Sequence, residues 1–123
     1  MKSVFSILIA TFAITSLKAQ YANTSWKGFY KIPDPQEMIL LFKNDTLLLV
    51  DPQNHEPIET MNYKANGDTI SLTKISGGSD CDGQTAIYKM TIKDNKLFIS
   101  VMNDECVNRA ASTPDGPLEK IED

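Results

Sequence analysis

Apolar and polar residues alternate along most of the chain beyond residue 24, with the period of two that is typical of β-strands. The clearest case is residues 84–93, where Ala86, Tyr88, Met90 and Ile92 occupy every second position. Successive side chains of a strand point to opposite faces, so this set should face a core. Comparable runs rich in β-branched and aromatic residues recur between turn signals. The pattern predicts eight strands, at residues 25–32, 37–43, 46–51, 58–65, 68–75, 84–93, 96–103 and 118–122.

Turn residues separate these segments at short intervals. The run Pro33-Asp34-Pro35 ends the first strand, because proline fixes φ and cannot donate to a ladder. Three tight hairpins are expected, at Asn44-Asp45, Asn66-Gly67 and Asp94-Asn95. Residues 107–117 leave room for one turn of helix before the last strand.

An even number of strands with short local connections lets the last strand pair antiparallel with the first. Closure removes exposed edges, which favours a barrel over an open sheet. The predicted fold class is therefore all-β, an up-and-down antiparallel meander closing into a barrel. A β-sandwich is the alternative.

The first residues have the pattern of a cleavable signal peptide. Lys2 precedes the apolar run 4–14, and small and polar residues follow up to Ala19. The run is much shorter than the roughly 20 apolar residues that span a bilayer, so no membrane anchor is expected. We predict cleavage between Ala19 and Gln20, a secreted or periplasmic location, and a single domain at residues 20–123.

Cleavage would remove two lysines and take the formal net charge from −4 to −6. The remaining basic residues are scattered, which argues against nucleic acid as a partner. Cys81 and Cys106 are the two cysteines, and export favours their pairing in a disulfide.

Three short motifs give the chain a resemblance to lipocalin-like (calycin-like) small secreted bacterial proteins. They are Trp26-Lys27-Gly28-Phe29-Tyr30, the hairpin at residues 63–70, and Asp104-Glu105-Cys106-Val107-Asn108-Arg109. In lipocalins an arginine stacks over the tryptophan of the first strand, and the resemblance assigns these structural roles to Arg109 and Trp26. The chain departs from the pattern at Thr24, where lipocalins usually have glycine, and Arg109 precedes the last predicted strand.

Candidate chemistry is sparse. His55 lies in a polar loop without an activated serine or cysteine nucleophile beside it, so no enzyme is expected. We expect no cofactor and no metal site. The methionines raise the alternative of a copper(I) site, but methionine is also an ordinary core residue.

Aromatic and methionine side chains predicted to face inward could line a pocket for a small hydrophobic or amphipathic ligand. These candidates are Tyr30, Met61, Tyr63, Tyr88 and Met90. The same residues equally suit a filled core. The alternative function is a protein-binding module such as a periplasmic protease inhibitor, for which an ordered N-terminal arm at Gln20 to Thr24, or an exposed apolar patch at the loops, would be the discriminating feature.

Overall fold

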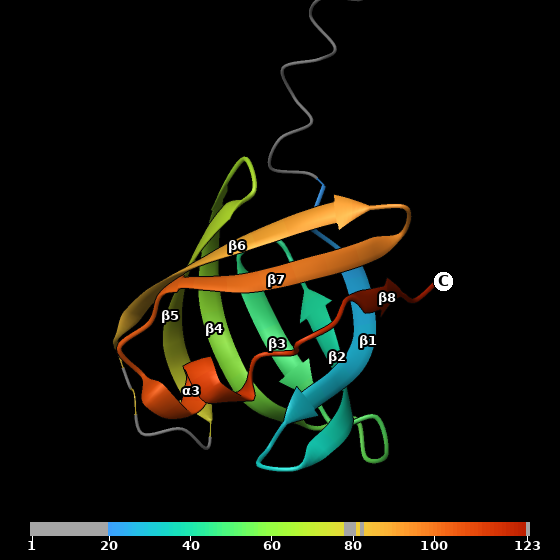
Figure 1. Ribbon diagram of the computed structural model, residues 1–123, viewed down its shortest axis with the longest axis horizontal. Helices are drawn as coiled ribbons and strands as arrows, with labels where there is room; N and C mark the ends of the chain where they lie inside the picture. The colour runs from blue at the N-terminus through green and yellow to red at the C-terminus, as the bar shows by residue number, and fades with distance from the viewer. Residues whose placement is uncertain (1–19, 78–80, 82, 123) are drawn as a thin grey trace, which may run out of the picture.

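A computed structural model describes residues 20–77, 81 and 83–122, so the predicted signal peptide lies outside the described residues. Eight strands pair in chain order and form a closed antiparallel barrel, as predicted (Figure 1). This architecture is compatible with a lipocalin-like fold and excludes the β-sandwich. The strands are β1 (Thr24–Lys31), β2 (Pro35–Phe42), β3 (Thr46–Val50), β4 (Pro57–Asn66), β5 (Thr69–Gly77), β6 (Thr85–Lys93), β7 (Lys96–Asn103) and β8 (Leu118–Lys120), with the helix α3 (Val107–Ser112) between β7 and β8.

Every predicted strand is present, with ends within two residues of those expected. The hairpin between β6 and β7 turns at Asp94 and Asn95, whose φ angles of 54° and 60° fit a type I′ turn. The hairpin between β4 and β5 differs by one position from the Asn66-Gly67 turn predicted. Asn66 pairs with Thr69, so the loop residues are Gly67 and Asp68, and Gly67 supplies the positive φ of 65°.

The barrel closes through its shortest strand. β8 pairs with β1 through Trp26–Lys120 and Lys27–Glu119, and with β7 near Lys96 and Leu97. Gly28 makes this close approach feasible, because a Cβ there would overlap the side chain of Leu118, which is fully buried. The seam between β7 and β1 is therefore narrow and tightly packed.

One end of the barrel is filled by aromatic side chains and forms its floor. Tyr21 precedes β1 and is fully buried, and its hydroxyl donates to the backbone carbonyl of Met90. The Tyr21 ring packs 5.5 Å from Phe42, and Phe42 makes an edge contact with Tyr63 at 5.2 Å. The side chain of Tyr21 therefore closes the end of the barrel at which β1 begins.

The opposite end carries the helix and the disulfide. Figure 1 shows α3 at this end, opposite the end at which the chain enters β1. The predicted disulfide between Cys81 and Cys106 is present, with 5.7 Å between the Cα atoms, and it fixes the residue that precedes α3. No helix within the described part of the chain is long and apolar enough to cross a membrane.

Candidate ligand-binding cavity

A cavity of about 590 Å³ occupies the half of the barrel that faces α3. Its walls come from residues of β1 to β7. The end opposite the floor is lined by residues of α3 and by Tyr30 to Pro33 at the end of β1, and we call this end the mouth. Most lining side chains are apolar. The full set is Tyr30, Lys31, Ile32, Pro33, Leu40, Leu47, Leu49, Ile58, Glu59, Met61, Leu72, Tyr88, Met90, Ile99, Asn108, Arg109, Ala111, Ser112 and Thr113.

Four of the five predicted pocket residues lie in this lining. Tyr30, Met61, Tyr88 and Met90 come from three different strands and converge on the cavity. Tyr63 is buried but lies in the floor, where its hydroxyl donates to the carbonyl of Lys43 at 2.7 Å. Both sequence-based interpretations therefore describe part of the barrel, because the floor is a filled core and the other half is hollow.

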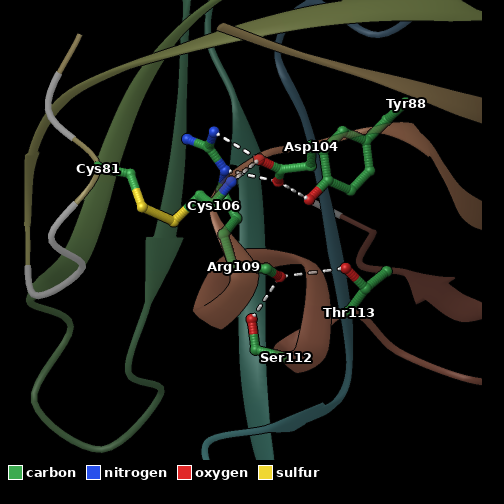
Figure 2. Close-up of polar contacts among 7 residues, drawn as sticks. All are labelled: Cys81, Tyr88, Asp104, Cys106, Arg109, Ser112 and Thr113. Atoms are coloured by element: carbon green, nitrogen blue, oxygen red, sulfur yellow. Dashed lines mark hydrogen bonds and ion pairs between the residues drawn. A yellow bond between two sulfur atoms is a disulfide. The ribbon is translucent and has the colours of Figure 1, made fainter. Parts of the chain in front are cut away.

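A polar network runs along the wall beneath α3 (Figure 2). The guanidinium of Arg109 donates from Nε and Nη2 to both carboxylate oxygens of Asp104, at 2.8 and 2.9 Å. The hydroxyl of Tyr88 and the backbone N–H of Cys106 also donate to this carboxylate. Ser112 and Thr113 donate to the carbonyl of Arg109 and tie the helix end to the same network.

The pKa values of the groups in this network decide which of them donate hydrogen bonds and which accept. Burial tends to raise the pKa of Asp104, but hydrogen bonds from Arg109, Tyr88 and Cys106 outweigh it and hold the pKa below its ordinary value. Burial and the adjacent Asp104 carboxylate raise the pKa of Tyr88. Asp104 is therefore the acceptor at neutral pH, and Tyr88 and Arg109 are the donors.

The predicted stacking of Arg109 over Trp26 is wrong. No cation–π contact joins these two side chains, and Arg109 instead faces Asp104. The side chain of Trp26 is buried, and its indole Nε1 donates to the hydroxyl of Thr24 at 2.9 Å. A carboxylate five residues away offers bidentate hydrogen bonds that a tryptophan face cannot match.

Two features of the lining were not predicted. Glu59 alternates with Met61 and Tyr63, so its position in the pattern already places it on the inner face of β4. Its charge favoured an outward orientation, yet it is buried and lines the cavity. The other feature is α3, because six residues give too short a pattern to fix which face covers the barrel.

The remaining candidates lie away from the cavity. His55 is exposed in the loop before β4. Met102 is exposed on β7, so it does not join Met61 and Met90 in the interior. Among the described residues, no group of three or more histidine, cysteine, aspartate or glutamate side chains is placed to hold a metal ion.

Comparison with known proteins finds no matching family model, no matching curated protein and no matching solved structure.

Proposed function

We propose that this protein is a secreted, non-enzymatic, lipocalin-like carrier that binds a small hydrophobic or amphipathic ligand inside its barrel. The cavity carries the proposal. Its volume of about 590 Å³ falls within the range of roughly 300 to 1,000 Å³ common for small-molecule sites. Its lining is largely apolar and includes a few convergent polar groups, which is the usual composition of such a site.

The arrangement of the lining suits an amphipathic molecule. Leu40, Leu47 and Met90 lie toward the floor, whereas Tyr30 and Arg109 lie toward the mouth. An apolar tail would pack against the apolar side chains near the floor. A polar head would meet hydroxyl and guanidinium groups beneath α3. The two halves of such a ligand therefore match the two halves of the cavity.

The disulfide and the N-terminal segment bear on location and on the alternative function. The Cys81–Cys106 bond fits an oxidising compartment such as the periplasm or the extracellular space. Residues 20–24 are described, and the side chain of Tyr21 is buried in the floor, so an ordered N-terminal segment does not count against the protein-binding module. We favour the carrier because of the cavity of about 590 Å³.

Native mass spectrometry of the protein isolated from its host's exported fraction tests the proposal. We expect a small molecule to accompany the folded protein and to be lost on unfolding. The intact mass also tests cleavage between Ala19 and Gln20. A protein that is empty and takes up no hydrophobic probe would contradict the carrier function.

A pair of variants on α3 links binding to the cavity. Ala111 and Val107 are both exposed on this helix, but only Ala111 lines the cavity. Ala111→Trp should narrow the mouth and weaken uptake of an environment-sensitive fluorescent probe about tenfold or more, a loss of roughly 1.4 kcal/mol. Val107→Trp should leave uptake unchanged, and equal effects of the two changes would place the probe outside the barrel.

A further inference from the structure

Much of β7 lacks a neighbouring strand along one edge. The strand runs from Lys96 to Asn103, but β8 pairs with it only at Lys96 and Leu97. Figure 1 shows the chain between α3 and β8 diverging from the rest of β7. Residues 98–103 therefore lie beyond the last ladder pair with β8, and we call their outer side the free edge of β7.

The backbone groups along the free edge lack partners. In an antiparallel ladder, every second residue directs both its N–H and its C=O toward the same neighbouring strand. On β7 these are the odd-numbered residues for β8, because the carbonyl of Asn95 accepts from Lys120 and Leu97 also pairs with that strand. Ile99 and Val101 continue the series. Among the described residues no backbone group pairs with them on that side, so each presents a donor and an acceptor.

The side chains of the free edge are uncharged and mostly exposed. Phe98, Val101 and Met102 are 43%, 39% and 59% exposed, and Ser100 is exposed as well. Natural sheets commonly protect such an edge with lysine, proline or other charged side chains. None of these occurs in residues 98–103. The sequence of the free edge therefore does not oppose pairing with another strand.

The free edge is complementary to a second copy of itself. When two such edges pair antiparallel about Ser100, Ile99 of each copy lies opposite Val101 of the other. Residues paired in this way exchange both of their N–H···O bonds. On the outer face, Phe98 of one copy then lies opposite Met102 of the other, and sulfur–aromatic contacts of this kind are favourable. No charged residues meet directly across this pairing.

We propose that two copies of this protein associate through the free edges of β7, paired antiparallel about a two-fold axis at Ser100. The symmetry closes the assembly, because the same edge is used in both copies. A second copy fits better than an unrelated extended peptide, because the edge itself supplies the matching residues. The pairing is short, so the dimer should dissociate on dilution. The proposal goes beyond the carrier function and does not depend on it.

Analytical ultracentrifugation of the full mature chain over a wide range of protein concentrations measures the association. We expect the average mass to rise from that of the monomer toward that of the dimer. Ser100→Lys places two lysines opposite each other at the two-fold axis, where like charges repel. It should weaken dimerisation about tenfold or more, a factor that corresponds to roughly 1.4 kcal/mol.

Asn62→Lys is the matched control. Asn62 is also exposed on a strand, but β4 has a neighbour on both sides at this position, β3 at Thr46 and β5 at Thr73. This variant should dimerise like the natural chain. Circular dichroism should show that both variants keep the β-structure of the natural chain, so a difference in mass would report the contact and not the fold.

Amide exchange followed by NMR identifies the backbone groups that pair. The amides of Ile99 and Val101 should exchange rapidly in dilute protein and about tenfold more slowly in concentrated protein. The amide of Ser100 is the internal control, because Ser100 pairs with Lys89 and directs its N–H toward β6. It should be protected at both concentrations.

Three results would overturn the proposal. The first is a chain that stays monomeric at every concentration, including one whose Ile99 and Val101 amides are protected only by an added peptide, since the edge would then bind a strand of another protein. The second is a dimer that persists unchanged in Ser100→Lys, because its contact would lie elsewhere. The third is equal protection of both amides at all concentrations, which would mean that the chain covers its own edge.

Discussion

The Asp104 carboxylate accepts hydrogen bonds from three groups, so the position of α3 depends strongly on this one residue. Its carboxylate connects Arg109 of α3, Tyr88 of β6 and the backbone at Cys106. The side chain of Asp104 is fully buried, and that of Arg109 is 8% exposed. Removing one member of such a pair leaves an uncompensated buried charge. The ionised Asp104 carboxylate therefore holds the helix over the cavity together with the disulfide at Cys106.

We predict that Asp104→Asn destabilises the protein by about 3 to 5 kcal/mol at neutral pH, because Arg109 loses its charge partner. Denaturant unfolding measures the loss. Asp115→Asn removes an exposed partner of Lys31 and serves as the control, with an expected change of about 0.5 kcal/mol or less. Similar losses of stability in both variants would show that the burial of an ion pair does not determine how much its removal destabilises the protein.

The same residue predicts how stability varies in acid. The pKa of Asp104 is lower in the folded chain than its ordinary value of 3.8, so the unfolded chain binds the proton more readily. Its contribution is complete above about pH 4 and is lost as the pH falls through the folded-state pKa. Unfolding measured across this range should be less steep in pH for Asp104→Asn than for the natural chain.

At the scale of single residues, alternation correctly placed buried side chains of β4 and β6, including Met61, Ala86 and Met90. It could not identify the partner of Arg109. Whether a guanidinium meets a ring or a carboxylate depends on where a six-residue helix packs, and no local pattern contains that information.

Among the elements, β8 depends most on one small residue of another strand. Gly28 leaves the space that the buried side chain of Leu118 occupies. We predict that Gly28→Ala destabilises the barrel by about 1 to 3 kcal/mol through overpacking at the seam. Thermal unfolding would show the loss.

Gly116→Ala is the matched control, because a Cβ at Gly116 meets nothing within 4 Å. It should change stability by about 0.5 kcal/mol or less. In a Leu118→Ala background the Gly28 substitution should become nearly neutral, since the overlap disappears. A full effect of Gly28→Ala in that background would mean that its cause is not contact with Leu118.

Strand positions could be predicted well because two-residue periodicity and turn residues are local signals. The turn at Gly67-Asp68 shows the limit of such signals. The dipeptide Asn66-Gly67 marks the hairpin, but cross-strand pairing decides which two residues form the loop, and it places Asn66 within β4.

The whole molecule combines a barrel closed by hydrogen bonds with a mouth held by a covalent link. The disulfide joins residues 25 positions apart and connects the segment after β5 to the start of α3. The chain-entropy account gives such a loop about 3.5 kcal/mol of stabilisation. Because the link lies at the mouth, its loss should release α3 before it affects the floor.

We predict that the double substitution Cys81→Ser and Cys106→Ser lowers the free energy of unfolding by about 2 to 4 kcal/mol. Amide hydrogen exchange should increase first in α3 and least around Tyr21 and Phe42. A reductant should affect the natural chain and leave the double variant unchanged. Uniform loss of protection across the barrel would contradict a local role for the bond.

The closed architecture could be predicted from eight strands in a meander, but the division between floor and cavity could not. The same aromatic and aliphatic residues suit either a filled or a hollow interior. The floor is filled because Tyr21, which lies outside the strands, adds its ring to that end of the barrel. That contribution comes from a segment with no strand pattern of its own.

Among the described residues, the buried Tyr21 ring closes one end of the barrel. For the carrier that we propose, a ligand bound with its tail toward the floor would therefore have to leave through the opposite end, with its head group first. Release would then be stepwise, because the head group would reach solvent while the tail was still inside the barrel.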